Sequence, residues 1–85
     1  MSDAWVYMLR CADGSLYTGW STDVAKRLER HRAGKASRYT ASRLPVALVY
    51  EAAMGDRSAA RREEARIKAL PRAGKLELVA AQRDD

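Results

Sequence analysis

The stretch from Val6 to Gly19, VYMLRCADGSLYTG, decides the fold, because it predicts a β-hairpin whose register fixes the positions of two tyrosines. Both arms are rich in β-branched and aromatic residues, and the Asp-Gly pair between them is typical of a tight turn. A two-residue turn would send Tyr7 and Tyr17 to opposite faces of the sheet. A three-residue loop with Gly14 in the left-handed conformation instead pairs Tyr7 with Gly19 and puts both rings on one face. We expect this second register.

Two interpretations of the shared face remain open at this point. In the first, Gly19 lies opposite Tyr7 and leaves an open notch beside two phenol groups, which would suit a bound substrate. In the second, Tyr7 and Tyr17 are an aromatic pair that packs the sheet.

The rest of the chain reads as alternating helices and strands. Capping residues at 21–23 precede a helix over 24–33, which Gly34 ends. The segment 35–44 is a basic loop or a short irregular helix, and 46–53 is an apolar third strand. The turn 55–58 starts a long helix over 59–70, and Pro71 begins a last helix through about Ala81. The fold class is therefore α/β (α+β): a small three-stranded, mainly antiparallel sheet flanked by helices in the order ββαβαα. We expect one domain over 1–82 and a short tail over 83–85.

Length and composition exclude several classes of protein. Eighty-five residues form one domain, and the single Cys11 cannot form an internal disulfide. The chain has no cluster of Cys and His at zinc-ligand spacing. It has neither a secretory signal nor an apolar run long enough for a membrane helix. We expect a cytoplasmic protein without membrane contact.

Positive charge is concentrated in one segment. The formal net charge is +5, and residues 26–43 carry seven cationic side chains against the single carboxylate of Glu29. The cations are Lys26, Arg27, Arg30, Arg32, Lys35, Arg38 and Arg43. This segment suits a polyanionic partner such as nucleic acid, and a solubilising surface is the alternative.

Polar residues lie beside the apolar stripe of the first helix. Val24 and Leu28 define that stripe, and Arg27 and His31, four positions apart, lie close to it. The pair would face the sheet, as part of a site or as a snorkelling arginine and a satisfied boundary histidine.

The second long helix places a carboxylate among apolar neighbours. Ala60, Glu64 and Ile67 form one stripe, and a buried carboxylate needs a partner. That partner could be a neighbouring arginine or a hard cation such as Mg²⁺, which takes oxygen ligands. Two phenols, an arginine, an imidazole and a carboxylate together are a sufficient set for phosphodiester hydrolysis.

These residues also carry a resemblance. Val6-Tyr7 and Tyr17-Thr18-Gly19 resemble the two-part signature of the GIY-YIG nuclease superfamily, although Trp5-Val6 replaces its Gly-Ile. Arg27 and His31 fall at the spacing of that family's first helix. The segment AARREEARIK, with its Glu64, resembles the helix that carries the family's metal-binding glutamate. The blocks HRAGKASRYTASRLPVALVYEA and GDRSAARREEARIKAL are similar to the small stand-alone bacterial members of UPF0213 type.

The resemblance implies an endonuclease that hydrolyses one strand of DNA, and the expected substrates are nicked, flapped or branched forms. The implied cofactor is a divalent metal, Mg²⁺ or Mn²⁺, held by Glu64. Tyr7 and Tyr17 would position or deprotonate the attacking water, with Tyr17 favoured as the base. Arg27 would bind the scissile phosphate and His31 would relay a proton.

The substrate-binding residues expected around this centre are Gly19, Lys26, Arg30, Lys35, Arg38 and Arg43. The expected partners are DNA and a protein that targets the enzyme, and the expected state is a monomer or weak dimer. The alternative function is a nucleic-acid-binding domain with little or no turnover, which would use the same basic surface.

Overall fold

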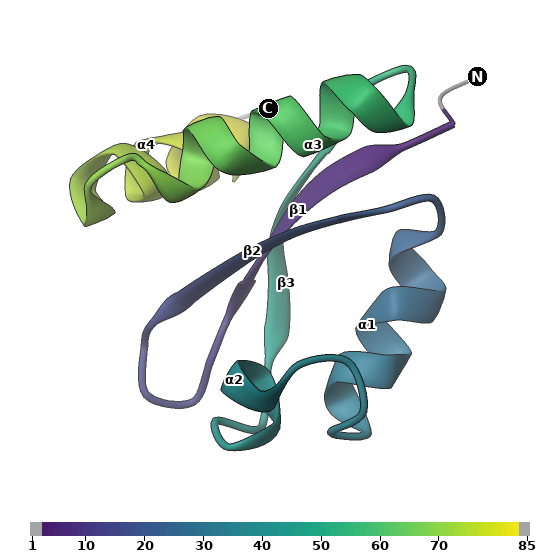
Figure 1. Ribbon diagram of the computed structural model, residues 1–85. Coiled ribbons are helices and arrows are strands. Elements are labelled where there is room, and N and C mark those ends of the chain that lie inside the picture. Colours follow the sequence, from purple (N-terminus) through teal and green to yellow (C-terminus); the bar gives the residue numbers. More distant parts are fainter. Residues whose placement is uncertain (1–2, 84–85) are drawn as a thin grey trace.

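The computed structural model describes residues 3–83 and has the predicted α+β fold (Figure 1). Three strands form one sheet, and helices cover both of its faces. The order is ββαβαα with one further short helix. The elements are β1 (Trp5–Arg10), β2 (Leu16–Ser21), α1 (Val24–Arg32), α2 (Arg38–Ala41), β3 (Ala47–Ala53), α3 (Arg57–Lys68) and α4 (Arg72–Arg83).

The hairpin has the expected register. The strand order is β2-β1-β3 with both pairings antiparallel, and Tyr7 pairs with Gly19 while Leu9 pairs with Tyr17. Gly14 has φ of 84°, and the Cys11 amide donates to the Ser15 carbonyl at 2.9 Å across the loop. The three-residue loop therefore puts both tyrosine rings on one face, where they join the same apolar cluster.

Alternation along the central strand divides the core into two layers. Tyr7 and Leu9 project toward α1 and pack with Val24. Val6 and Met8 project to the other face, where α3 and α4 cover them (Figure 1). Because β1 lies between two helical layers, its side chains from Val6 to Leu9 are all buried.

Side-chain caps set the helix boundaries. Asp23 accepts from the Lys26 amide at 3.0 Å, which starts α1 at the expected residue. Asp56 accepts from the Ala59 amide at 2.7 Å, so α3 begins two residues earlier than the expected residue 59.

The structure decides one open alternative and moves one boundary. The segment 35–44, for which a basic loop and a short irregular helix were both expected, contains the short helix α2, capped by Ser37. Helix α4 continues to Arg83, beyond the expected end near Ala81, so Arg83 is helical. Residues 84–85 of the expected tail lie outside the described residues.

The open notch expected at Gly19 does not exist, because the Tyr7 ring fills it. A Cβ added at Gly19 would lie 2.6 Å from Tyr7 Oη and 2.7 Å from its Cζ. These distances are far inside van der Waals contact. Gly19 thus makes room for a buried phenol of the protein itself and leaves no space there for a substrate.

We predict that Gly19→Ala destabilises the fold by about 1–3 kcal/mol, since the methyl group must push the buried Tyr7 ring out of place. Urea denaturation measures this change. Gly74→Ala is the matched control, because its new Cβ would meet Leu70 at 3.4 Å, an ordinary contact, and alanine favours the α4 helix. Equal stability of Gly19→Ala and wild type would contradict the close contact.

Candidate functional site

A buried hydrogen bond joins the first strand to the first helix. Tyr7 Oη lies 2.7 Å from His31 Nε2, and both side chains are 1% exposed. The sequence predicts that these residues share a site, and the structure brings them into direct contact. His31 can reach the strand because it follows Val24 on the buried side of α1.

The contacts of Thr40 indicate the direction of this hydrogen bond. His31 Nδ1 lies 2.8 Å from Thr40 Oγ1, and the Thr40 hydroxyl donates its one proton to the Ser37 carbonyl at 3.3 Å. With its proton used in this way, the hydroxyl oxygen accepts from a protonated Nδ1, and this is the tautomer that we assign. In the neutral ring Nε2 is then the unprotonated nitrogen, so Tyr7 donates to His31.

Burial acts on both members of the pair. It lowers the pKa of His31 from its ordinary value, and the nearby charge of Arg27 lowers it further. Burial also raises the pKa of Tyr7 to about 12, with a further contribution from Tyr17, while Arg27 acts in the opposite direction. At neutral pH the pair is therefore a neutral phenol that donates to a neutral imidazole.

Tyr17 meets the same histidine through its ring. Its centroid lies 5.1 Å from that of His31 with the planes at 63°, an edge-to-face contact. Tyr39 of α2 stacks on Tyr17 with centroids 6.0 Å apart. Both predicted tyrosines therefore contact His31, one by a hydrogen bond and the other by its ring.

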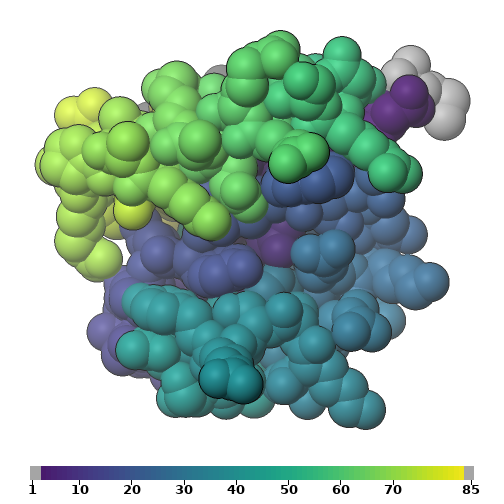
Figure 2. All heavy atoms as spheres, viewed as in Figure 1, coloured from purple at the N-terminus to yellow at the C-terminus, as the bar shows by residue number. Residues whose placement is uncertain are grey.

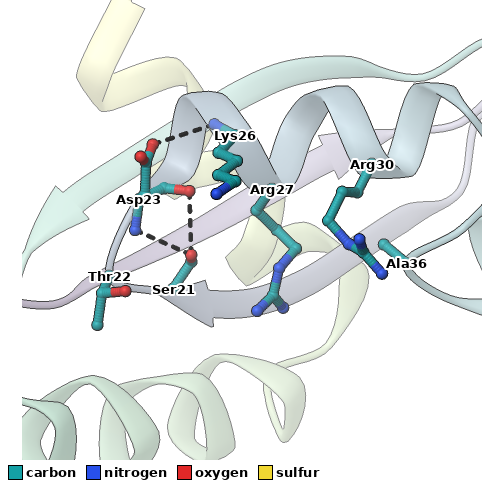
Figure 3. Close-up of a pocket in the computed structure, with 7 residues that line it drawn as sticks. All are labelled: Ser21, Thr22, Asp23, Lys26, Arg27, Arg30 and Ala36. Carbon is teal, nitrogen blue, oxygen red and sulfur yellow. Dashed lines mark hydrogen bonds between the residues drawn. The ribbon is translucent and has the colours of Figure 1, made fainter.

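Arg27 connects this pair to a basic cavity. A cavity of about 400 Å³ lies at the start of α1. Figure 3 shows Arg27 and Arg30 extending from the same side of the helix, with the polar segment 21–23 at one end. The residues that line this cavity are Ser21, Thr22, Asp23, Lys26, Arg27, Arg30 and Ala36. The Asp23 carboxylate caps the helix, so three cations face a single anion.

A second basic cavity continues the first. It measures about 250 Å³, and Lys35 and Arg38 line it together with Ala36, which also lines the first cavity. The predicted binding residues Lys26, Arg30, Lys35 and Arg38 thus lie along two adjoining hollows. In Figure 2 the purple of β1 is visible at the centre of a depression bordered by β2, α1, α2 and α3.

Arg43 does not line either cavity. Its Nε donates to Asp13 at 3.1 Å, its Nη1 donates to the Tyr39 carbonyl at 2.9 Å, and its guanidinium lies 3.8 Å above the Tyr39 ring. These contacts place Arg43 with the hairpin loop and α2. Gly19 is the other predicted substrate-binding residue that lines neither cavity, and it lies under Tyr7.

The two adjacent glutamates of α3 have different surroundings. Glu63 accepts two hydrogen bonds of 2.7 Å from Arg66, which holds the pKa of its carboxyl below the usual range. Glu64 lies close enough to Tyr7 for its negative charge to raise the pKa of that phenol. Its nearest ionic partner is Lys68 at 3.6 Å, and its side chain is 24% exposed. Glu64 is thus the glutamate near Tyr7, whereas Glu63 lies near Tyr50.

The donor set of this site fits one kind of metal binding. Within residues 3–83 no three His, Cys, Asp or Glu side chains come together as metal ligands. Mg²⁺ is commonly bound by one or two carboxylates, with waters and substrate phosphates completing the shell. The partly exposed carboxylate of Glu64 fits this mode of binding, in which the protein supplies one ligand.

Sequence reasoning missed two residues of the site, Thr40 and Tyr39. Both lie on α2, a helix of four residues. The sequence left open whether this segment forms a loop or a short helix. Thr40 is 0% exposed, nine positions from His31. Only the tertiary fold brings it to that ring, so no local pattern could have indicated it.

The model of the GIY-YIG catalytic domain matches residues 3–77. The chain belongs to the GIY-YIG family. This is a nuclease family, so membership assigns the chain to a family of hydrolases. The GIY-YIG match spans all the site residues described above. No helix within residues 3–83 is long and apolar enough to cross a bilayer.

Individual relatives match this chain over most of their length. A UPF0213 protein of Streptococcus sanguinis is 49% identical, covering 86% of this chain and 84% of the relative. A UPF0213 protein of Natronomonas pharaonis is 47% identical, covering 93% of each. The solution NMR structure of a UPF0213 protein from Bacillus halodurans matches with a TM-score of 0.60 and 42% identity, covering 92% of this chain and 83% of that one.

We predict that His31 is neutral at pH 7 with its proton on Nδ1, and that it titrates below its ordinary pKa of about 6.5, because burial and Arg27 disfavour the cation. NMR of ¹⁵N-labelled imidazole measures both properties, and the chain has one histidine, so the signal is unambiguous. Between the unfolded and the lowered folded pKa the unfolded state binds more protons, so stability should fall as the pH drops through this range. A proton on Nε2 at pH 7 would contradict the assigned direction of the hydrogen bond.

Proposed function

We propose that this protein is a divalent-metal-dependent endonuclease that hydrolyses a phosphodiester bond in one strand of DNA. The observation that carries the proposal is the buried hydrogen bond from Tyr7 to His31, with Arg27 beside both groups. A proton-accepting chain next to a guanidinium suits attack of water on a phosphodiester. Nicked, flapped or branched DNA is the substrate class proposed.

The proton path follows from the direction of the hydrogen bonds. Because Tyr7 donates its proton to His31, its oxygen can accept from the attacking water as well as from Arg27. The water proton passes to Tyr7 Oη as the phenol proton passes to His31 Nε2. This relay avoids a free phenolate, which is scarce at neutral pH for a group whose pKa is about 12. His31 then becomes an imidazolium, and its Nδ1 proton stays hydrogen-bonded to Thr40 Oγ1.

This path assigns the base role to Tyr7 rather than to Tyr17, the residue favoured from the sequence. Tyr17 contacts His31 through its ring edge, a contact that positions groups but transfers no proton. Its proposed role is to close the site around the water and to hold the imidazole plane.

The cations have two proposed roles. Arg27 lies near the proton relay, so its guanidinium binds the scissile phosphate and stabilises the charge that develops there. Lys26, Arg30, Lys35 and Arg38 line the two adjoining cavities and bind the flanking phosphates.

Glu64 is the proposed metal ligand, on the side of Tyr7 where its charge reaches the phenol. A bound divalent cation supplies charge neutralisation at the leaving oxygen. Lys68 balances the Glu64 carboxylate in the free protein, and this partly exposed pair is weak enough to be exchanged for a stronger ligand.

A nucleic-acid-binding domain with little turnover is the second candidate, and the basic cavities support it equally. Binding alone requires neither a buried phenol that donates to an imidazole nor a carboxylate beside it. These two features favour the enzyme.

We predict that Glu64→Gln lowers nicking of supercoiled DNA in Mg²⁺ by orders of magnitude, because the amide keeps the shape but loses the charge that holds the cation. DNA affinity should persist or tighten, since a negative charge near the phosphates is removed.

Glu63→Gln is the matched control. It loses the exposed pair with Arg66, worth about 0–1 kcal/mol, and should nick at the wild-type rate. Wild-type nicking by Glu64→Gln would rule out the metal role. No nicking by the wild type, with DNA binding intact, would favour the binding domain.

A further inference from the structure

We infer that Arg43 and Tyr39 are positioning residues, which hold the Tyr17 ring against His31 and bind no phosphate themselves. The catalytic consequence of this inference rests on the proposed nuclease function. The structural part stands on the contacts among Asp13, Arg43, Tyr39 and Tyr17, which form a column from the hairpin loop to the buried histidine.

The column is continuous. Arg43 Nε donates to Asp13 Oδ2 at 3.1 Å, and the Arg43 guanidinium carbon lies 3.8 Å from the Tyr39 ring centroid. Tyr39 stacks on Tyr17 at 27° and 6.0 Å, and Tyr17 meets His31 at 5.1 Å. The first contact is an ion pair, and the other three are cation–π, stacked and edge-to-face arrangements of the kind that fixes ring orientation.

The Nε and Nη1 donors of Arg43 are already engaged. Besides Asp13, it donates through Nη1 to the Tyr39 carbonyl at 2.9 Å and to Ser42 Oγ at 3.0 Å. Its own carbonyl accepts from the Ala12 amide at 2.9 Å. A phosphate that bound through Nε and Nη1 would have to displace the carboxylate and the carbonyl, so Arg43 differs from Arg38, which is exposed and lines a basic cavity.

Asp13 is built as a fixed anchor. The Ser15 hydroxyl and amide donate to Asp13 Oδ1 at 2.6 and 3.0 Å. These bonds, followed by Arg43, hold the pKa of the Asp13 carboxyl below its usual range. The anchor therefore stays ionised, and the turn that sets the hairpin register also supports the site.

Tyr17 needs such a support because it lies on β2, an edge strand, and is only partly buried. Tyr39 is itself 38% exposed, yet its ring is engaged by Tyr17 and Arg43, so a nucleobase stacking there would have to compete with both. Removing the support should free the Tyr17 ring and slow cleavage by roughly 10- to 100-fold, the cost of a small misplacement in an active site.

The first test needs no activity. Tyr39→Leu should change the NMR chemical shifts of the Tyr17 and His31 ring protons, because the stacked ring is lost, whereas Tyr39→Phe should preserve the Tyr17 and His31 contact. The chain has four tyrosines and one histidine, so the ring signals can be assigned. Unchanged Tyr17 and His31 signals in Tyr39→Leu would overturn the inference, whether or not the protein proves to be a nuclease.

The second test compares two arginines. Arg43→Ala should slow nicking with little change in DNA affinity or its salt dependence, and Arg43→Lys should not restore the rate, since lysine lacks the planar fork. Arg38→Ala should weaken binding and reduce the salt slope by about 1. An equal loss of salt slope in Arg43→Ala would make it a phosphate contact and overturn its positioning role.

A double-mutant cycle tests whether Tyr39 acts on the nicking rate through Tyr17. If Tyr39 acts through Tyr17, Tyr39→Leu should slow nicking much less in a Tyr17→Leu background than in wild type. Additive effects on the nicking rate would overturn the column as the route of action. Absence of nicking in the wild type would instead count against the proposed function and leave the NMR result to decide the column.

Discussion

The hydrogen bond between Tyr7 and His31 is the interaction on which the site depends, and a glycine makes it possible. The phenol lies directly over Gly19 of the neighbouring strand, at a distance that no side chain would allow. The register that pairs Tyr7 with Gly19 follows from the three-residue loop and the left-handed Gly14. A turn in one part of the chain thus sets the position of a buried phenol in another.

Charge is distributed around this bond in a way that suits a polyanion and a cation together. Lys26, Arg27 and Arg30 line the cavity on the α1 side, and Glu64 contributes the carboxylate from α3. The neutral pair lies near both, since Arg27 and Glu64 act in opposite directions on the pKa of Tyr7. The short helix α2 supports the site with two consecutive residues, since Tyr39 contacts Tyr17 and Thr40 contacts His31.

The sequence predicts those features that local rules determine. The Asp-Gly turn gave the hairpin register, and helical periodicity placed His31 on the buried side of α1 and Glu64 in the stripe with Ala60 and Ile67. It could not predict that Tyr7 would fill the space over Gly19, because that depends on a side-chain rotamer. It also could not predict the partners of Arg43 or Thr40, since both are joined to residues brought together by the tertiary fold.

The most direct measurement of the central claim is the nicking rate of Tyr7→Phe in Mg²⁺, with DNA affinity measured alongside. Phenylalanine keeps the ring over Gly19 and removes only the hydroxyl, leaving His31 Nε2 without its donor at a cost of about 1–3 kcal/mol. The account predicts that nicking is lost while the fold and DNA affinity are retained. Nicking at the wild-type rate would contradict it.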